Sequence, residues 1–252
     1  MKMKKLDANA LRALKGKQAI PMLTAYNYPV ARSMEKAGLP VLLVGDSVGM
    51  VEMGFSSTRE VTVEHIQYHI GAVRRGAPNT HIIGDMPYAS DNTKEAAYKN
   101  AMLLIEAGAD SVKLEGPKYE VIKHLIDNGI DVVGHSGLTP QTAENFKQVG
   151  KDQQDASRII AEAKAIEAAG AFMLVLEHIP AALGSAVTQA IDIPTIGIGA
   201  GGDCDGQVLV INDALGMGDY WPPFSKQYAH VSQTLDDVVK RFIEEVTDKR
   251  FP

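Results

Sequence analysis

The chain has 252 residues, of which 45% are hydrophobic, and a formal net charge of -6 at pH 7. This length suits one large single-core domain, and an acidic chain without a basic stripe excludes nucleic acid as an expected partner. Its only cysteine, Cys204, excludes an internal disulfide and favours a cytoplasmic location. The apolar runs are too short to span a bilayer, so we expect no membrane partner.

The N-terminal residues 1–18 are basic but contain no apolar stretch, so they do not predict a secretory signal. A short amphipathic helix is the simpler interpretation, and a transit peptide stays open as the alternative. Beyond this segment, eight short runs rich in β-branched residues alternate with longer amphipathic ones. They predict strands at residues 20–25, 41–46, 81–86, 110–116, 130–135, 171–177, 194–200 and 207–213.

Helical patterns separate most of these strands, as in residues 93–109 and 155–171, which both end in Gly-Ala before the next strand. The Gly- and Pro-rich residues 217–227 predict a long loop, and residues 228–246 predict a final helix. Eight β–α alternations predict a parallel sheet, closed into a (β/α)8 TIM barrel that forms a single domain over residues 1–252. An open doubly wound sheet is the structural alternative.

Ionisable side chains recur at the C-terminal ends of the predicted strands, where barrel enzymes keep their chemistry. Taken singly, each has an ordinary explanation, because an aspartate after a strand is often a helix N-cap and a loop histidine is often simply hydrogen-bonded. In "VKLEG", however, a lysine and a glutamate two residues apart face the same side of one strand. The set expected to share one rim is Asp46, Asp85, Lys113, Glu115, His135 and Glu177.

Four carboxylates in one small space repel each other unless a positive charge lies among them. A hard divalent cation meets this need, and oxygen donors favour magnesium over zinc. Asp46, Asp85 and Glu115 end three sequential strands and are the expected ligands. Open positions on such a metal suit a bidentate 2-oxo acid, whose enolate the metal stabilises as a Lewis acid, while Lys113 neutralises a substrate oxygen. A plain ion pair at the barrel mouth is the alternative.

The segment "GIGAGG", residues 197–202, matches the G-x-G-x-x-G pattern of dinucleotide-binding sites. That fingerprint opens a helix in the first βαβ unit, whereas these glycines come late and run into a predicted strand. We therefore expect no nicotinamide cofactor. In a barrel, such a turn after the seventh strand either cradles phosphate or is simply a tight turn.

Seven motifs stand in a fixed order along almost the whole chain: "TAYNYPVARSMEKAGLPVLLVGDSVGMV", "GAVRRGAP", "GDMPY", "VKLEG", "GHSGLTPQ", "LVLEHIP" and "IGIGAGGDCDGQVLVINDALG". Together they closely resemble those of the ketopantoate hydroxymethyltransferase (3-methyl-2-oxobutanoate hydroxymethyltransferase) family. The resemblance implies a barrel of the phosphoenolpyruvate/pyruvate type. It also implies a magnesium-dependent enzyme of pantothenate and coenzyme A biosynthesis, which transfers a hydroxymethyl group from 5,10-methylenetetrahydrofolate to 3-methyl-2-oxobutanoate and gives 2-dehydropantoate.

The resemblance also implies roles for single residues. Asp46, Asp85 and Glu115 match the family's magnesium-linked carboxylates, and Glu177 matches its proton acceptor. The substrate contacts implied in the same way are Asp46, Ser47, Asp85, Lys113 and His135. The large ring-like assemblies of the family imply a homo-oligomer, specifically a homodecamer.

Three residues beside this set depart from the family's usual motifs, namely Pro117, Ser136 and His178. None of them is an expected ligand, but Ser136 and His178 adjoin site residues and leave the local polarity open. Two other functions also stay open. One is a magnesium-dependent carbon–carbon lyase of the same barrel type, although Cys204 is badly placed for the cysteine-containing lid that such enzymes commonly carry. The other is a non-catalytic binding protein with a degenerate site.

Overall fold

The fold is that of a computed structural model, which describes residues 5–218 and 221–252. The chain forms two compact units, residues 1–208 and 209–252, where the sequence predicts a single domain. The first unit holds the barrel. Because a closed barrel has no free strand edge, the chain that follows the last strand has no sheet to extend.

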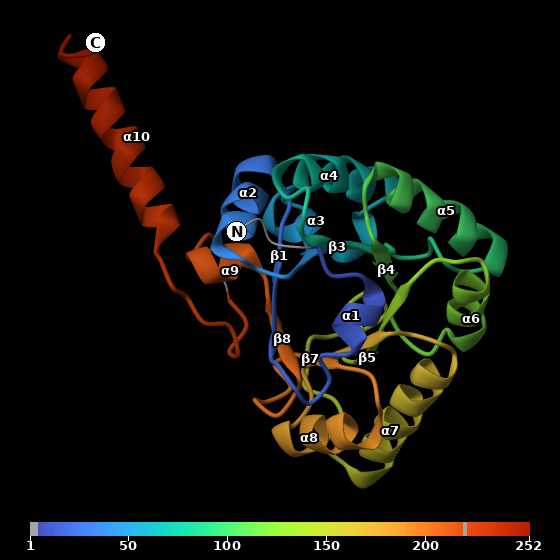
Figure 1. The fold of residues 1–252 in the computed structure, drawn as a ribbon. Helices are drawn as coiled ribbons and strands as arrows, with labels where there is room; N and C mark the ends of the chain where they lie inside the picture. The colour runs from blue at the N-terminus through green and yellow to red at the C-terminus, as the bar shows by residue number, and fades with distance from the viewer. Residues whose placement is uncertain (1–4, 219–220) are drawn as a thin grey trace. The chain divides into compact units, whose positions relative to one another are not determined.

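Eight strands form a closed barrel in chain order, and the paired strands are parallel (Figure 1). This confirms the predicted (β/α)8 class and excludes the open sheet. The amide of Ile20 donates to the carbonyl oxygen of Asp205 over 3.0 Å, which joins the first strand to the chain just before the last. The strands are β1 (Ile20–Thr24), β2 (Val41–Val44), β3 (His81–Asp85), β4 (Ser111–Lys113), β5 (Val132–Gly137), β6 (Met173–Glu177), β7 (Thr195–Ile198) and β8 (Gly206–Leu209).

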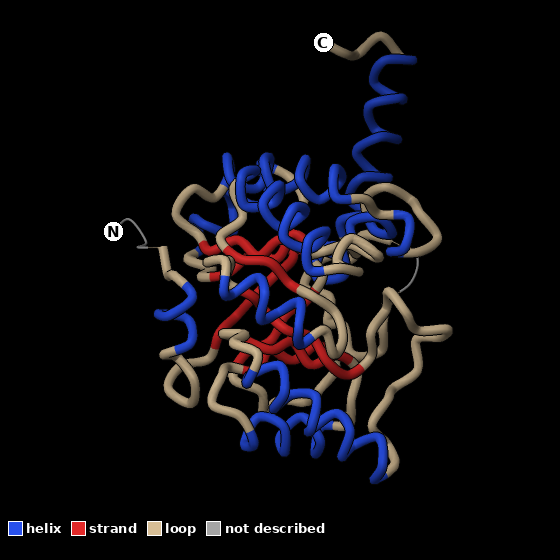
Figure 2. The backbone as a smooth tube through the Cα atoms, turned by 90° about the vertical axis from the view of Figure 1, so that its right-hand side faces the viewer, coloured by secondary structure: helices blue, strands red, loops and turns tan. Residues whose placement is uncertain are grey.

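Helices follow the strands and cover the outside of the barrel (Figure 2). Local sequence sets where they begin and end. Thr62 and His65 cap the start of α4 reciprocally, Thr93 caps the start of α5, and Gly108 ends α5 in the left-handed conformation. The helices of this unit are α1 (Ala8–Arg12), α2 (Tyr28–Ala37), α3 (Val48–Val51), η1 (Thr58–Glu60), α4 (Val63–Gly76), α5 (Lys94–Ala107), α6 (Tyr119–Asp127), α7 (Gln153–Ala168) and α8 (Ala181–Ala190).

The inward faces of the strands change from apolar to ionisable along the barrel. Ile83 of β3 and Val175 of β6 belong to one buried apolar cluster inside the barrel. Two residues later on the same strands, and therefore on the same inward face, stand Asp85 and Glu177. This alternation aims the ionisable side chains at the C-terminal mouth, as the sequence predicted.

The leading segment closes the opposite, N-terminal end of the barrel. Ala8 and Leu11 of α1 are buried in the apolar cluster, and His81 Nδ1 at the start of β3 lies 2.9 Å from the carbonyl oxygen of Leu6. The structure thus contains the predicted leading helix over residues 8–12, and residues 1–4 of the predicted segment lie outside the described part.

The second unit shows one difference from the predicted elements. The strand predicted over residues 207–213 stops at Leu209, and the chain continues as the short helix α9 (Ile211–Leu215). An apolar run does not by itself distinguish a strand from a buried helix, which explains the error. The predicted final helix is α10 (Val231–Thr247), and residues 219–220 of the predicted loop lie outside the described residues. Among the helices described, none is both long and apolar enough to cross a membrane.

Candidate active site

The residues with predicted site roles all lie at or just beyond the C-terminal ends of strands. They come from five consecutive strands of the barrel, so the closed sheet brings them to one mouth. The charges of Lys113, Asp46 and Asp85 all act on the Glu177 carboxyl, which places these four groups in one electrostatic cluster. The predicted residues are Asp46 and Ser47 after β2, Asp85 in β3, Lys113 in β4, Glu115 after β4, His135 in β5 and Glu177 in β6.

Lys113 supplies the positive charge of the cluster. Its Nζ lies 2.8 Å from Asp85 Oδ1, and the two side chains are only 5% and 2% exposed. Burial by itself lowers the pKa of Lys113, but the carboxylates of Asp85 and Glu115 outweigh burial and raise it above its ordinary value. Lys113 therefore remains an ammonium group at neutral pH. Both charged side chains of "VKLEG", Lys113 and Glu115, lie in the mouth.

Asp46 stands directly against Asp85. The Asp46 backbone amide donates to Asp85 Oδ2 over 3.1 Å, and a Cβ at Gly45 would approach Ser47 Oγ to 3.1 Å, so the absence of a side chain at Gly45 keeps this corner open. Burial, followed by the charge of Asp85, raises the pKa of Asp46 to about 7. At neutral pH this carboxyl therefore lacks the compensating charge that would keep it fully ionised.

Glu115 and His135 face each other on neighbouring strands. Burial raises the pKa of Glu115 above its ordinary value, whereas burial and the Lys113 charge lower the pKa of His135 well below its own. His135 is therefore neutral, and its Nδ1 lies 3.4 Å from Lys113 Nζ. Because an ammonium group offers only protons, Nδ1 is the accepting nitrogen and Nε2 carries the ring proton.

Glu177 is the carboxylate of the cluster that reaches open space. Its side chain is 18% exposed, against 4% for Glu115, and its Oε2 lies 3.4 Å from His135 Nε2. Burial raises the pKa of Glu177 to about 8. Gly137, with a φ of 100°, makes room at this point, because a Cβ there would stand 2.4 Å from the Glu177 carbonyl oxygen.

Ser47 has a buried phenol as its partner. Its Oγ lies 2.8 Å from the hydroxyl of Tyr26, which follows β1 and is 1% exposed. Burial raises the pKa of Tyr26 above its ordinary value, so this phenol stays protonated. Tyr26 lies within the first family-like motif, but nothing in the spacing of that motif assigned it a place in the site.

Gln141 and Arg59 are further residues of the mouth for which the sequence predicted no role. Gln141, on the loop between β5 and α7, donates from Nε2 to Asp46 Oδ2 over 2.8 Å. Arg59, in η1, donates from Nε to the carbonyl oxygen of Gln141 over 2.7 Å. Gln141 ends the motif "GHSGLTPQ", so its presence beside His135 was visible in the sequence, although its contact with Asp46 was not.

The departures from the family motifs leave the charge cluster intact. Ser136 points away from the mouth and donates from Oγ to Glu162 Oε2 of α7 over 2.8 Å. His178 adopts a positive φ of 46° after β6, a conformation that non-glycine residues seldom adopt. Pro117 lies in the loop from β4 to α6, two residues before the helix, and borders a separate hollow.

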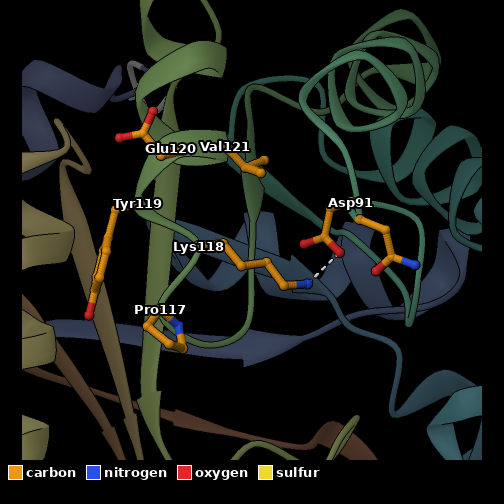
Figure 3. Close-up of a pocket in the computed structure, with 7 residues that line it drawn as sticks. Asp91, Pro117, Lys118, Tyr119, Glu120 and Val121 are labelled. Atoms are coloured by element: carbon orange, nitrogen blue, oxygen red, sulfur yellow. Dashed lines mark hydrogen bonds and ion pairs between the residues drawn. The ribbon is translucent and has the colours of Figure 1, made fainter.

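That hollow, of about 260 Å³, lies among the loops that follow β3 and β4 (Figure 3). On one side Lys118, just before α6, forms an ion pair with the buried Asp91. None of the seven predicted site residues lines it. The lining residues are Asp91, Asn92, Pro117, Lys118, Tyr119, Glu120 and Val121.

The predicted set of three carboxylate ligands is not preformed. Across residues 5–218 and 221–252, no three His, Cys, Asp or Glu side chains are grouped closely enough to hold a metal ion. The Lys113 ammonium is paired with Asp85, and Glu115 Oε2 accepts the backbone amide of Gln141 over 3.0 Å. Asp46 and Asp85 are adjacent carboxylates, and magnesium in proteins usually needs only one or two carboxylates because it keeps several waters.

Comparison with solved structures identifies the class of barrel. The chain is similar to a putative phosphonomutase from Burkholderia cenocepacia J2315, with a TM-score of 0.67 and 16% identity over 93% of this chain and 97% of that one. It is also similar to 2,3-dimethylmalate lyase, a member of the PEP mutase/isocitrate lyase superfamily, with a TM-score of 0.63 and 13% identity over 96% and 88%. These likenesses confirm the TIM-barrel fold and, at such identities, show the fold alone.

Sequence relatives narrow this class to one family. The family model for ketopantoate hydroxymethyltransferase matches residues 5–252. The 3-methyl-2-oxobutanoate hydroxymethyltransferases of Syntrophus aciditrophicus and Colwellia psychrerythraea are 46% and 47% identical to this chain, over 99% and 92% of it and 95% and 90% of their own lengths. That of Pyrobaculum islandicum is 46% identical over 94% of both chains. The chain therefore belongs to the ketopantoate hydroxymethyltransferase family, as its motifs predicted.

Proposed function

We propose that the chain transfers a hydroxymethyl group from 5,10-methylenetetrahydrofolate to 3-methyl-2-oxobutanoate and gives 2-dehydropantoate for pantothenate biosynthesis. Membership of the family supports the class of reaction. One observation carries the assignment of residues: a buried Lys113–Asp85 pair stands beside Glu177, whose side chain is more exposed than those of Asp85 and Glu115. That arrangement offers a fixed positive charge for an anionic substrate and an accessible base next to it.

Magnesium is the proposed metal, and Asp46 and Asp85 are the residues that would hold it, with Glu115 completing the acidic rim. The raised pKa of Asp46, caused by burial and by the charge of Asp85, shows that the mouth lacks positive charge. A divalent cation would supply that charge. When bound, it would polarise the keto oxygen of the 2-oxo acid as a Lewis acid.

The side chains of the mouth suit the remaining tasks. Lys113 is placed to contact the substrate carboxylate or the developing enolate oxygen, while Ser47 and His135 line the oxo acid. Glu177 would take the proton from C3, since burial holds its pKa near neutral pH, where a general base works best. C3 then bonds to the folate methylene carbon as one of that carbon's two bonds to folate nitrogen breaks. Water supplies the hydroxyl oxygen as the second carbon–nitrogen bond breaks, and each released nitrogen takes up one proton, one equivalent to the proton lost from C3 and one from the water.

The direct test is the formation of 2-dehydropantoate by the purified chain from the two substrates and Mg²⁺. Product should be absent without folate and should fall sharply with a chelator. A folded, metal-supplied chain that forms no product would disprove the proposed reaction. The role of Glu177 has its own test, because Glu177→Gln should stop proton exchange at C3 of the oxo acid in deuterated water without folate. Normal exchange in that variant excludes Glu177 as the C3 base.

A carbon–carbon lyase of the same barrel type is the alternative enzyme, and the same preparation separates it. A lyase would cleave a 2-oxo or 2-hydroxy acid without any folate, whereas the proposed transferase requires folate and lengthens its substrate by one carbon. A binding protein would do neither, although it would still bind the oxo acid.

We also propose that the chain forms a homo-oligomer, and specifically the homodecamer that the family resemblance implies. Support comes from α10, whose large apolar side chains repeat at intervals of three and four residues and are exposed in a single chain. Light scattering on the purified chain should give a mass near ten protomers, and a monomeric mass would contradict the proposal. The exposed residues are Leu235, Val238, Val239, Phe242, Ile243 and Val246.

A further inference from the structure

Gln141 joins three strand ends through its side-chain Nε2 and its backbone amide. The residue is 2% exposed. Its side-chain Nε2 donates to Asp46 Oδ2 over 2.8 Å and to the carbonyl oxygen of Met86 over 3.0 Å. Its backbone amide donates to Glu115 Oε2 over 3.0 Å. One residue of the loop after β5 therefore contacts the chain just beyond β2, β3 and β4.

The backbone carbonyl oxygen of Gln141 is held by a residue of another segment, η1. Arg59 of η1 donates from Nε to this oxygen over 2.7 Å and from Nη2 to the carbonyl oxygen of Ala143 over 3.2 Å. The guanidinium carbon lies 5.6 Å from the centre of the Tyr88 ring. A planar guanidinium can donate in two directions while stacking on a ring, which a lysine cannot do.

These contacts fix the direction of two carboxylates that would otherwise repel each other. The side-chain amide of Gln141 donates to Asp46 Oδ2, and its backbone amide donates to Glu115 Oε2. Each carboxylate is therefore held through one oxygen and keeps its other oxygen for a different partner. A neutral amide provides this hold without adding a further charge to a cluster that already contains four carboxylates. Lys113 cannot replace it, because its ammonium group is paired with Asp85.

We propose that Gln141 is a positioning residue, which orients Asp46 and Glu115 for binding of the cation and the 2-oxo acid, and that Arg59 holds Gln141 in place. This inference rests on the proposed function. It assigns to the loop after β5 and to η1 a part in substrate affinity, although neither segment contributes any of the seven predicted site residues.

The test compares Gln141→Ala with Gln148→Ala, which makes the same change in the same loop at a half-buried glutamine outside the contacts just described. Titration calorimetry with Mg²⁺ alone, and with the oxo acid in saturating Mg²⁺, measures both affinities without turnover. We expect both dissociation constants and the KM for the oxo acid to rise about tenfold in Gln141→Ala. At saturating substrates kcat should change less than about threefold, and Gln148→Ala should match the wild type. Thermal unfolding verifies that each variant is folded.

A second pair of variants keeps the test decisive if Gln141→Ala does not fold. Arg59→Ala should raise the same constants about threefold, Arg59→Lys should restore little of this loss because it cannot bridge two carbonyl groups, and the exposed Arg75→Ala should have no effect. Affinities within twofold of the wild type in each folded variant of Gln141→Ala and Arg59→Ala overturn the inference, as does a wild-type chain that binds no divalent cation. A wild-type chain that binds Mg²⁺ and the oxo acid but forms no product overturns the proposed function, while weaker binding in Gln141→Ala still supports the positioning role.

Discussion

The two ends of the barrel treat buried acidic side chains in opposite ways. At the N-terminal end, burial alone would raise the pKa of Asp110, but hydrogen bonds from Lys5 and from the amide of Ile82 lower it below its ordinary value. Asp205 behaves likewise, since its bond from Lys15, 2.8 Å long, is joined by bonds from backbone amides that together outweigh burial and lower its pKa. Asp110 and Asp205 therefore each have enough donors to remain ionised at little cost.

At the C-terminal mouth the balance is reversed. Burial raises the pKa of Asp46 to about 7 and that of Glu177 to about 8, because one ammonium group, Lys113, serves four carboxylates. The same fold therefore stabilises its acids at one end and leaves them poorly compensated at the other. Groups with shifted pKa values gathered on one rim are typical of a reactive site. The contrast therefore indicates a functional role for the C-terminal mouth and a structural role for the N-terminal end, the floor of the barrel.

The largest effect that would sharpen this contrast is expected from Glu177→Gln. A positioned base typically contributes about 10²–10⁴-fold to a rate, so kcat should fall by that range. The wild-type profile of kcat/KM should rise with pH along an acid limb, since Glu177 must lose its proton to act and burial raises its pKa above the ordinary value. Steady-state kinetics between pH 6 and 9 would measure both. Glu144→Gln, an exposed change in the mouth loop, is the control; a Glu177→Gln profile that keeps the wild-type acid limb would contradict this role.

The next effect concerns Lys113, the ammonium group that is paired with Asp85. Lys113→Met keeps the apolar length of the side chain but leaves the carboxylates without their ammonium partner, so kcat/KM should fall by about 10²–10³-fold. Lys118→Met removes another lysine that pairs with a buried aspartate near the mouth. In this variant kcat/KM should fall less than about tenfold. Equal losses in the two variants would show that any buried ion pair near the rim has this effect.

The site residues could be predicted where they lie on strands or within three residues of a strand end, and not where they lie farther along the connecting segments. Strand alternation requires that Lys113 and Glu115 share a face, and the closed parallel sheet requires that strand ends meet, so "VKLEG" sufficed to place them. Gln141 reaches Asp46 from an irregular loop, and Arg59 of η1 reaches Gln141, through paths that have no period in the sequence. The short α9 was missed for a related reason, since the apolar run that contains it has no turn residue to mark the end of β8.

The same contrast predicts opposite responses of stability to pH. A carboxyl with a raised pKa binds its proton more tightly in the folded chain than in the unfolded one, so the folded chain loses stability as pH rises from the unfolded value, about 4.3, towards the folded one. For Glu177, whose folded pKa is about 8, this loss is at most about 1.4 kcal/mol per pH unit.

Urea unfolding of the metal-free chain at pH 5.5 and 7.5, with Glu177→Gln as the reference, isolates this contribution. The wild type should lose stability relative to the variant at the higher pH, and Mg²⁺ should reduce the loss. If the wild type instead gains stability relative to the variant as pH rises, the Glu177 carboxylate has enough positive partners in the folded chain. The contrast between the two ends of the barrel would then be wrong.

His81 provides the smallest and opposite effect, at the floor. Its Nδ1 lies 2.9 Å from the carbonyl oxygen of Leu6 and its Nε2 lies 2.9 Å from Ser111 Oγ. A carbonyl oxygen only accepts, so Nδ1 carries the proton and Nε2 is free to accept from the serine. Burial lowers the pKa of His81, which means that the unfolded chain takes up a proton first as the pH falls. The floor should therefore lose stability below about pH 6.5, the ordinary value for histidine.

Comparison of the wild type with His81→Gln by urea unfolding at pH 7.5, 6.5 and 5.5 tests this, with His124→Gln on α6 as the control. The wild type should lose about 1 kcal/mol relative to His81→Gln between pH 6.5 and 5.5, and the control should show no such difference. The sign of this change in the free energy of unfolding matters more than its size. At the mouth, Glu177 stays protonated in the folded chain at pH values where it is ionised in the unfolded chain. At the floor, His81 stays neutral in the folded chain at pH values where it is protonated in the unfolded chain. If the wild type instead gained stability relative to His81→Gln as the pH fell, burial by the leading segment would not disfavour a protonated His81.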